Sequence, residues 1–307
     1  MVNTHDADGL LKIARGSLEL LLAPSVGGSI ARFDHVVDGL STPILRGTAG
    51  VPASPLDAAS FPLVPYCNRI RGGRFAFRGR QVRLDPNMAG DPSPLHGQGW
   101  LGPWRVESQS DSHAELVFRH DAGEWPWAWE ARQLFLIDET GLSVRLGCRN
   151  LSAEAMPCGL GQHPYFPCTP GTRLATDVTS VWTIDDRVLP IEKVPAVGRY
   201  DIKDRLICGQ DLDNGFGGWG GVARISAPDA PFTLQMSSPN ARFFQLYAPA
   251  QGGLFVAEPV THANAALNEP EEIWPELGLR VLEPGEEMSL DMRLGIEAAT
   301  SERFTNR

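Results

Sequence analysis

The chain has 307 residues and a formal net charge of −10, from 27 basic and 37 acidic side chains, and it contains no run of Lys or Arg. Nucleic acids and anionic surfaces are therefore not expected as partners, because both are bound through clustered positive charge. No apolar stretch approaches the roughly 20 residues that cross a bilayer, and the first residues lack a secretion signal. We expect a cytoplasmic protein with no membrane partner.

The N-terminal half of the chain is predicted to consist of strands and tight turns. Residues 10–24 read as two strands on either side of Gly16. Residues 75–84 alternate apolar and polar side chains around Arg78–Gly79–Arg80, which is typical of a β-hairpin. Two further strands are predicted, at Arg105–Ser108 and Ala114–Arg119.

The C-terminal half follows the same design. A hairpin is predicted over residues 132–150, with Asp138–Glu139–Thr140–Gly141 as its turn. Residues 271–277 are expected to form a short helical turn. Further strands are predicted at Arg224–Ser226, Phe232–Met236, Phe243–Tyr247, Leu254–Ala257 and Met288–Gly295.

These elements predict an all-β fold. The 32 glycines and 25 prolines indicate many turns, and no stretch keeps a helical period over 12 residues. Repeats of fixed length and low-complexity linkers are also missing from the sequence. Many short strands of this kind are typical of a large antiparallel β-sandwich, and we expect residues 1–307 to form a single domain.

The five cysteines do not suggest a disulfide framework or a zinc knuckle. Their number is odd and no CxxC spacing occurs. Reduced, mostly buried thiols are expected, in keeping with a cytoplasmic location.

Two of the seven histidines lie in loops of unusual composition. His96 is found in PLHGQGW, where glycines permit a close approach of backbone or ligand. His163 is found in GQHPYFP, where Pro164 restricts it to an extended conformation. An imidazole suits proton transfer near neutral pH. The alternative for each is a purely structural loop residue, and solvated positions are expected for His5, His35, His113 and His120.

Glu258 offers a carboxylate for the same site. It follows the apolar run 253–257, and a charge at the end of such a strand is a plausible base. An ordinary strand-end carboxylate is the alternative. Asp213 is either a ligand or a turn former, and Arg69 is either a ligand or an ion-pair partner. Metal binding through two histidines and a carboxylate is not expected, because no HxH, HxxxH or HExxH spacing occurs.

Six segments, taken together and in order, resemble the aldose 1-epimerase (mutarotase) family, most closely its bacterial branch. The resemblance covers roughly residues 61–268 and is specific, because chance agreement falls with each added motif. The segments are PYCNRIRGGRFAFRGR, PLHGQGW, WPWAWEARQLF, CGLGQHPYFP, LDNGFGGWGG and FVAEPVTHANAALN. The resemblance implies a galactose mutarotase-like β-sandwich, or supersandwich, that acts on a small-molecule sugar without a cofactor, as a monomer or homodimer.

The resemblance also implies roles for single residues. Glu258 corresponds to the catalytic base and His163 to the general acid, while His96 matches a second histidine near the ring oxygen or the anomeric hydroxyl. Asp213 and Arg69 correspond to sugar-binding residues. Asn68 and Tyr165, beside these motif positions, are expected to contact the sugar as well.

The substrate stays open at this point. Pro259–Val260–Thr261–His262 replaces a Gln-containing stretch of the galactose-acting members, and Asn214 replaces a histidine. A free aldose is expected; a hexose 6-phosphate is an alternative, with Arg69, Arg71 and Arg74 as cations. The further alternatives are a sugar-binding protein with a relic site and a glycoside hydrolase that uses Asp213 and Glu258. Trp125, Trp127 and Trp129, which alternate along a possible strand, are expected in the core or at the rim of the site.

Overall fold

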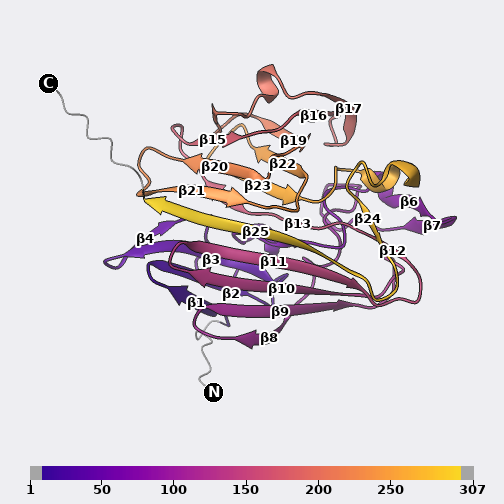
Figure 1. The fold of residues 1–307 in the computed structure, drawn as a ribbon, viewed down its shortest axis with the longest axis horizontal. Coiled ribbons are helices and arrows are strands. Elements are labelled where there is room, and N and C mark those ends of the chain that lie inside the picture. Colours follow the sequence, from indigo (N-terminus) through magenta and orange to yellow (C-terminus); the bar gives the residue numbers. More distant parts are fainter. Residues whose placement is uncertain (1–8, 299–307) are drawn as a thin grey trace.

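The computed structural model describes residues 9–298, and the elements within them are strands joined by turns and single turns of 3-10 helix (Figure 1). None of the described helices is long and apolar enough to cross a membrane. The 3-10 helices are η1 (Pro55–Asp57), η2 (Arg71–Gly73), η3 (Gly198–Tyr200), η4 (Ala266–Asn268) and η5 (Glu271–Ile273). The expected helical turn at residues 271–277 corresponds to η5.

The strands form two large sheets and one smaller sheet, with every neighbouring pair antiparallel. The nine-stranded sheet has the order β18 (Arg205–Leu206), β15 (Arg173–Thr176), β20 (Val222–Ser226), β21 (Phe232–Ser237), β25 (Glu287–Ala298), β11 (Gly141–Asn150), β10 (Trp129–Asp138), β9 (His113–His120) and β8 (Arg105–Gln109). The eight-stranded sheet comprises β17 (Pro190–Pro195), β16 (Ser180–Ile184), β19 (Leu212–Gly217), β22 (Phe243–Ala248), β23 (Leu254–Val260), β13 (Gly161–Gln162) and β5 (Pro62–Leu63), with β14 (Tyr165–Pro167) also paired to β23.

The smaller sheet packs against the nine-stranded sheet as a second layer. It contains β1 (Leu11–Arg15), β2 (Leu18–Ala23), β3 (Ser29–Val37) and β4 (Leu40–Pro43). β1 and β2 contact β10, and Figure 1 shows them behind the β9–β11 region. Two hairpin-like pairs complete the described strands: β6 (Arg74–Phe77) with β7 (Arg80–Arg83), and β12 (Met156–Cys158) with β24 (Arg280–Leu282). The predicted antiparallel β-sandwich is confirmed.

Alternation of side chains along the strands builds the core. In β10 the buried and more exposed residues alternate along all ten positions, as a pleated strand with one face covered requires. Leu20 of β2, Phe135 of β10 and Phe244 of β22 belong to one continuous apolar cluster that spans three sheets. Trp125, Trp127 and Trp129 are in this core, but only Trp129 lies in a strand, so their predicted alternation along one strand is wrong.

A chain of buried amides links the layers and reaches the neighbourhood of His163. Nε2 of Gln133 on β10 donates to the carbonyl oxygen of Gly28 at 2.8 Å. Nε2 of Gln162 on β13 donates in turn to Oε1 of Gln133 at 3.2 Å. Buried amides need such partners, so this chain fixes β13, and with it the residue before His163, relative to the core.

On one side of β23, the neighbouring strand is interrupted. β13 pairs with β23 at Val260, and β14 pairs with it from Leu254 to Val256. Between these two contacts, His163 and Pro164 leave the ladder opposite the central residues of β23. This interruption brings a loop histidine next to a strand carboxylate.

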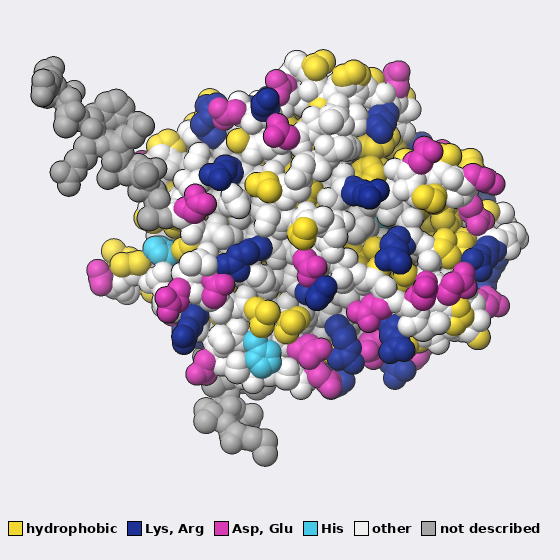
Figure 2. Space-filling model, in the orientation of Figure 1, with side chains coloured by type: hydrophobic (Ala, Val, Ile, Leu, Met, Phe, Trp, Pro, Cys, Tyr) yellow, Lys and Arg dark blue, Asp and Glu magenta, His cyan; other side chains and the backbone are white. Residues whose placement is uncertain are grey.

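Charged side chains are distributed over the surface without a single-sign patch on the face shown in Figure 2, where basic and acidic groups are intermixed. All five cysteines are free, and four of them are buried, as expected. His35, His113 and His120 are partly exposed, and His5 lies outside the described residues.

Candidate active site

A cavity of about 330 Å³ lies where β19, β22 and β23 meet the loops that carry the two predicted histidines. Its volume falls within the range of small-ligand pockets. All seven site residues predicted from the sequence line this cavity: Glu258, His163, His96, Arg69, Asp213, Asn68 and Tyr165. The other lining residues are Leu56, Met88, Leu95, Gln245 and Tyr247.

Glu258 lies inside β23 and not at its end, because the strand continues through Pro259 to Val260. Pro259 lies where β23 has no paired neighbour on one side. A proline has no backbone N–H, and on that side no hydrogen bond is lost by its absence. Only 3% of Glu258 is exposed, and its Oε1 lies 3.5 Å from Nε2 of His163. Within residues 9–298, Oε2 of Glu258 has no hydrogen-bond partner. A buried oxygen without a partner in the cavity is available to a ligand hydroxyl.

The two members of this pair have oppositely shifted pKa values. Burial raises the pKa of Glu258 well above its ordinary value, and the nearby charge of Asp213 raises it further, while Arg69 lowers it. Burial lowers the pKa of His163 to about 3, and Arg46 contributes to the decrease. Both shifts favour the neutral form, as expected where water is excluded. The carboxyl and the imidazole of this pair are therefore both shifted toward their uncharged forms.

His96 is held by the backbone of Asn68. The Asn68 N–H donates to Nδ1 of His96 at 3.1 Å, and the His96 N–H donates to the Asn68 carbonyl oxygen at 3.0 Å. The His96 ring stands edge-on to that of His163, with centroids 5.4 Å apart. Burial lowers the pKa of His96 well below its ordinary value, with smaller contributions from His163 and Arg69.

Asp213 lies on a strand and not in a turn. A turn was one alternative for Asp213, but residues 212–217 form β19. A side chain at Gly215 would place its Cβ 3.1 Å from Oε1 of Gln245, so the glycine makes room for that amide. Nε2 of Gln245 donates to Oδ1 of Asp213 at 3.0 Å. Burial raises the pKa of Asp213 to about 6, although Arg69 and the Gln245 hydrogen bond act to lower it.

Arg69 reaches the cavity as part of an ion pair. Its Nε lies 2.8 Å from Oδ2 of Asp91, and both side chains are nearly buried. Its backbone N–H donates to Oδ1 of Asn264 at 3.1 Å, which fixes the loop. Arg71 and Arg74 are exposed and do not line the cavity.

Gln245 and Tyr247 were not predicted as site residues. Both lie on β22, one strand from Glu258, and the register places Gln245 directly opposite Glu258. A glutamine inside the apolar run FFQLYA was the signal in the sequence. Leu56, Met88 and Leu95 carried no comparable signal, because apolar loop residues are common.

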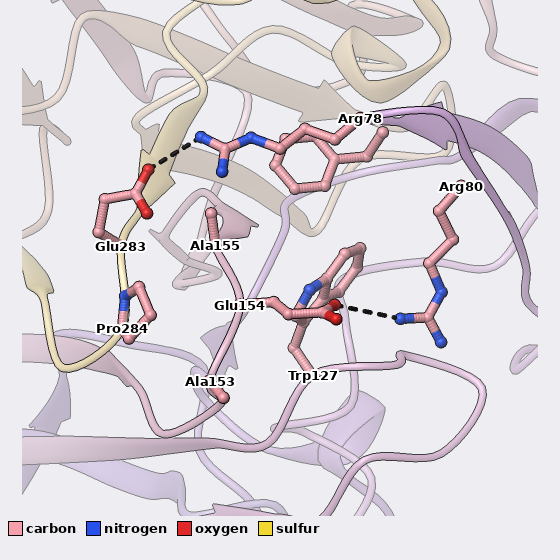
Figure 3. Close-up of a pocket in the computed structure, with 9 residues that line it drawn as sticks. Arg78, Arg80, Trp127, Ala153, Glu154, Ala155, Glu283 and Pro284 are labelled. Carbon is pink, nitrogen blue, oxygen red and sulfur yellow. Dashed lines mark hydrogen bonds and ion pairs between the residues drawn. The ribbon is translucent and has the colours of Figure 1, made fainter.

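A second hollow, larger at about 460 Å³, lies between the β6–β7 hairpin and the segments that flank β12 and β24 (Figure 3). Its guanidiniums are neutralised across the opening: Arg78 pairs with Glu283 at 2.8 Å and Arg80 with Glu154 at 3.7 Å. No histidine and none of the predicted site residues line it. Acid–base groups converge in the smaller cavity.

Fold and cavity together define a β-sandwich protein with a buried carboxyl–imidazole pair. The aldose 1-epimerase family model matches residues 11–295. The uncharacterized protein YphB of Escherichia coli K12 is 34% identical over 301 residues, which are 93% of this chain and 98% of that protein. The chain belongs to the aldose 1-epimerase family, and the match extends beyond residues 61–268.

Solved structures agree with this assignment. A provisionally named aldose 1-epimerase from Escherichia coli K12 superposes with a TM-score of 0.85 at 32% identity, covering 94% of this chain and 99% of that one. A galactose mutarotase-like protein from Clostridium acetobutylicum superposes with a TM-score of 0.82 at 19% identity, covering 94% and 95%. The predicted galactose mutarotase-like fold is confirmed, and the family supports an isomerase that acts on a small-molecule sugar.

Proposed function

We propose that the protein is a mutarotase that interconverts the α and β anomers of an unphosphorylated aldose. The observation that carries this proposal is the 3.5 Å approach of the His163 imidazole to the Glu258 carboxyl in a cavity of suitable size. Mutarotation needs a base for one oxygen and an acid for another in the same step, and this pair supplies both. A cytoplasmic location and a monomeric or homodimeric state stay predictions.

In the proposed reaction, Glu258 takes up one proton and His163 gives up one proton, so the pair as a whole neither gains nor loses a proton. Starting from ionised Glu258 and protonated His163, the carboxylate removes the proton from the C1 hydroxyl, and the imidazolium gives its proton to the ring oxygen. The C1–ring oxygen bond breaks, leaving an aldehyde and a hydroxyl on the chain. Rotation about C1–C2 exposes the other face of the aldehyde, and reclosure reverses both transfers.

The shift of both groups toward their neutral forms fits this cycle. Ring opening leaves Glu258 protonated and His163 neutral, which is the state that burial favours. Reclosure starts from that state. Transfer of the carboxyl proton from Oε1 of Glu258 to Nε2 of His163 converts it into the ion pair that opens the ring.

The charges of the cavity favour a neutral sugar over a sugar phosphate. Among the described lining residues, Arg69 is the one arginine or lysine, and Asp91 already pairs with it. The carboxyls Asp213 and Glu258 line the same space and would repel a phosphate when ionised. Arg71 and Arg74, which were considered as phosphate ligands, are exposed outside the cavity.

The test follows the optical rotation of freshly dissolved α-aldoses, and of the matching 6-phosphates, against the spontaneous rate. Acceleration of free aldoses, with weaker or no acceleration of the phosphates, is expected. Preference for the phosphates would overturn the choice of a neutral sugar. Binding of sugars by calorimetry without any acceleration would identify a binding protein, and release of reducing sugar from a glycoside would identify a hydrolase.

A further inference from the structure

Two residues of the cavity have left-handed backbone conformations although neither is glycine. The angle φ is 56° at Asn68 and 60° at His96. Such angles are uncommon for residues with a side chain, although asparagine and histidine tolerate them better than most. Conformations of this kind persist where surrounding contacts impose them, and they concentrate at functional sites.

The contacts that impose them here run between the two residues themselves. Each backbone N–H donates to the other residue, one to the carbonyl oxygen of Asn68 and one to Nδ1 of His96. A backbone amide can only donate, so Nδ1 of His96 has to present a lone pair. The proton of a neutral His96 ring therefore resides on Nε2, the nitrogen left for a ligand in the cavity.

We infer that Asn68 is a positioning residue whose backbone amide fixes His96 as a hydrogen-bond donor, through Nε2–H, toward the sugar. This inference rests on the proposed mutarotation. His96 then takes up and releases no proton during the cycle, and both transfers belong to Glu258 and His163. Its fixed N–H stabilises the oxygen on which negative charge develops, and losing one such donor costs about 10²–10³-fold in kcat.

His96 and His163 differ in the hydrogen bonding of their Nδ1 atoms. The backbone hydrogen bond to Nδ1 prevents protonation of His96 at that nitrogen as long as the left-handed turn at Asn68 persists. His163 has no such constraint: its Nδ1 lacks a hydrogen-bond partner among the described residues. One ring is a fixed donor, and the other is free to change its protonation.

The first test reads the tautomer directly in the resting protein, without sugar. Nitrogen NMR of histidine-labelled protein, with His96 assigned by comparison with His96→Gln, is expected to show an unprotonated Nδ1 and a protonated Nε2 from pH 6 to 8. A proton on Nδ1, or a ring protonated at both nitrogens, would overturn the inference. This result stands even if no aldose is turned over, so it separates failure of the inference from failure of the proposed function.

The second test separates the backbone of Asn68 from its side chain. Asn68→Gly keeps the amide and adopts a positive φ without steric cost, so its kcat is expected to stay at least fivefold above that of Asn68→Val, with any change in KM reflecting the lost side chain. Asn68→Val disfavours the left-handed conformation, so kcat is expected to fall about 10–100-fold and the His96 nitrogen signals to change. Asp38→Val is the matched control, because Asp38 is also left-handed (φ 50°) but exposed in the β3–β4 turn.

The outcomes are decisive in both directions. An equal loss of kcat in Asn68→Gly and Asn68→Val would assign the effect to the side chain and reject the positioning role. Unchanged nitrogen signals in Asn68→Val would reject it too. A loss of kcat at least fivefold larger in Asn68→Val than in Asn68→Gly, with altered His96 signals and a normal Asp38→Val, would support it.

Discussion

The imidazole of His163 lies nearly parallel to the ring of Phe61, with centroids 4.4 Å apart and an angle of 14° between the planes. Tyr165 also contacts the imidazole, at 4.7 Å between centroids, and the guanidinium of Arg46 lies 3.8 Å from the centre of the Tyr165 ring. Since Nδ1 of His163 has no hydrogen-bond partner within residues 9–298, ring packing sets the orientation of this imidazole.

Phe61→Leu is expected to lower kcat about tenfold with a smaller change in KM, because a loosely held imidazole spends less time aligned with the ring oxygen. Phe166→Leu is the matched control. Phe166 is equally buried and stacks on Phe255, but none of the ring contacts among the described residues joins it to His163. Polarimetric kinetics of both variants are the measurement. Equal losses of kcat in the two would indicate general destabilisation and no specific role for Phe61.

Glu258→Gln is expected to reduce kcat by about 10²–10⁴-fold while sugar affinity changes little, because the amide keeps the shape but accepts no proton. His163→Asn should show the same split between kcat and affinity. Glu283→Gln serves as control, since Glu283 is an exposed carboxylate at the second hollow. Near-normal turnover in Glu258→Gln would reject Glu258 as the base.

The activity is expected to depend on pH through Asp213. The pKa of this carboxyl is about 6, so the ionised form, which accepts hydrogen bonds from sugar hydroxyls, increases as the pH rises through that value. We expect kcat/KM to rise through pH 6 in the native protein and to lose this inflection in Asp213→Asn. The variant should also lower the pKa of Glu258, because the charge of Asp213 raises it. An unchanged inflection in Asp213→Asn would assign it to another group.

The same carboxyl is expected to weaken the fold at high pH. Its folded pKa lies above the ordinary value of 3.8, so between these values the folded state binds more protons than the unfolded state. The free energy of unfolding therefore falls as the pH rises from about 4 through 6. Asp213→Asn should stabilise the sugar-free protein by roughly 2–3 kcal/mol at pH 8 and very little at pH 4. Denaturant unfolding at the two pH values measures this, and equal effects at both would contradict the linkage.

Much of the scaffold could be predicted because its strands alternate clearly. The hairpins around Arg78–Arg80 and Asp138–Gly141 are confirmed by β6–β7 and β10–β11. β19 was missed because its glycines read as a loop, whereas Gly215 serves to admit the Gln245 amide. That requirement comes from a strand 30 residues away in the sequence and leaves no local pattern.

The sequence predicts which residues form the site better than it predicts where each one lies in the strands and loops. The family resemblance named Glu258 and His163, but the strand was expected to end at Ala257, and it continues through Glu258 to Val260. Its continuation depends on the interrupted ladder between β13 and β14, a tertiary relationship. The support of His96 by Asn68 could not be predicted either, because it depends on two left-handed residues whose hydrogen bonds join separate loops.

Because the ladder is interrupted opposite Glu258, strand pairing does not hold the segment that carries the His163 imidazole. The chain is tied to β23 on both sides of His163, through Val260 before it and Val256 after it. None of the three residues between Gly161 and Tyr165 pairs with β23, and the last two, His163 and Pro164, lie outside the strands, so strand register does not fix that pair of positions. An insertion or exchange at His163 and Pro164 would therefore alter the reach of the imidazole without separating the paired strands that carry Glu258.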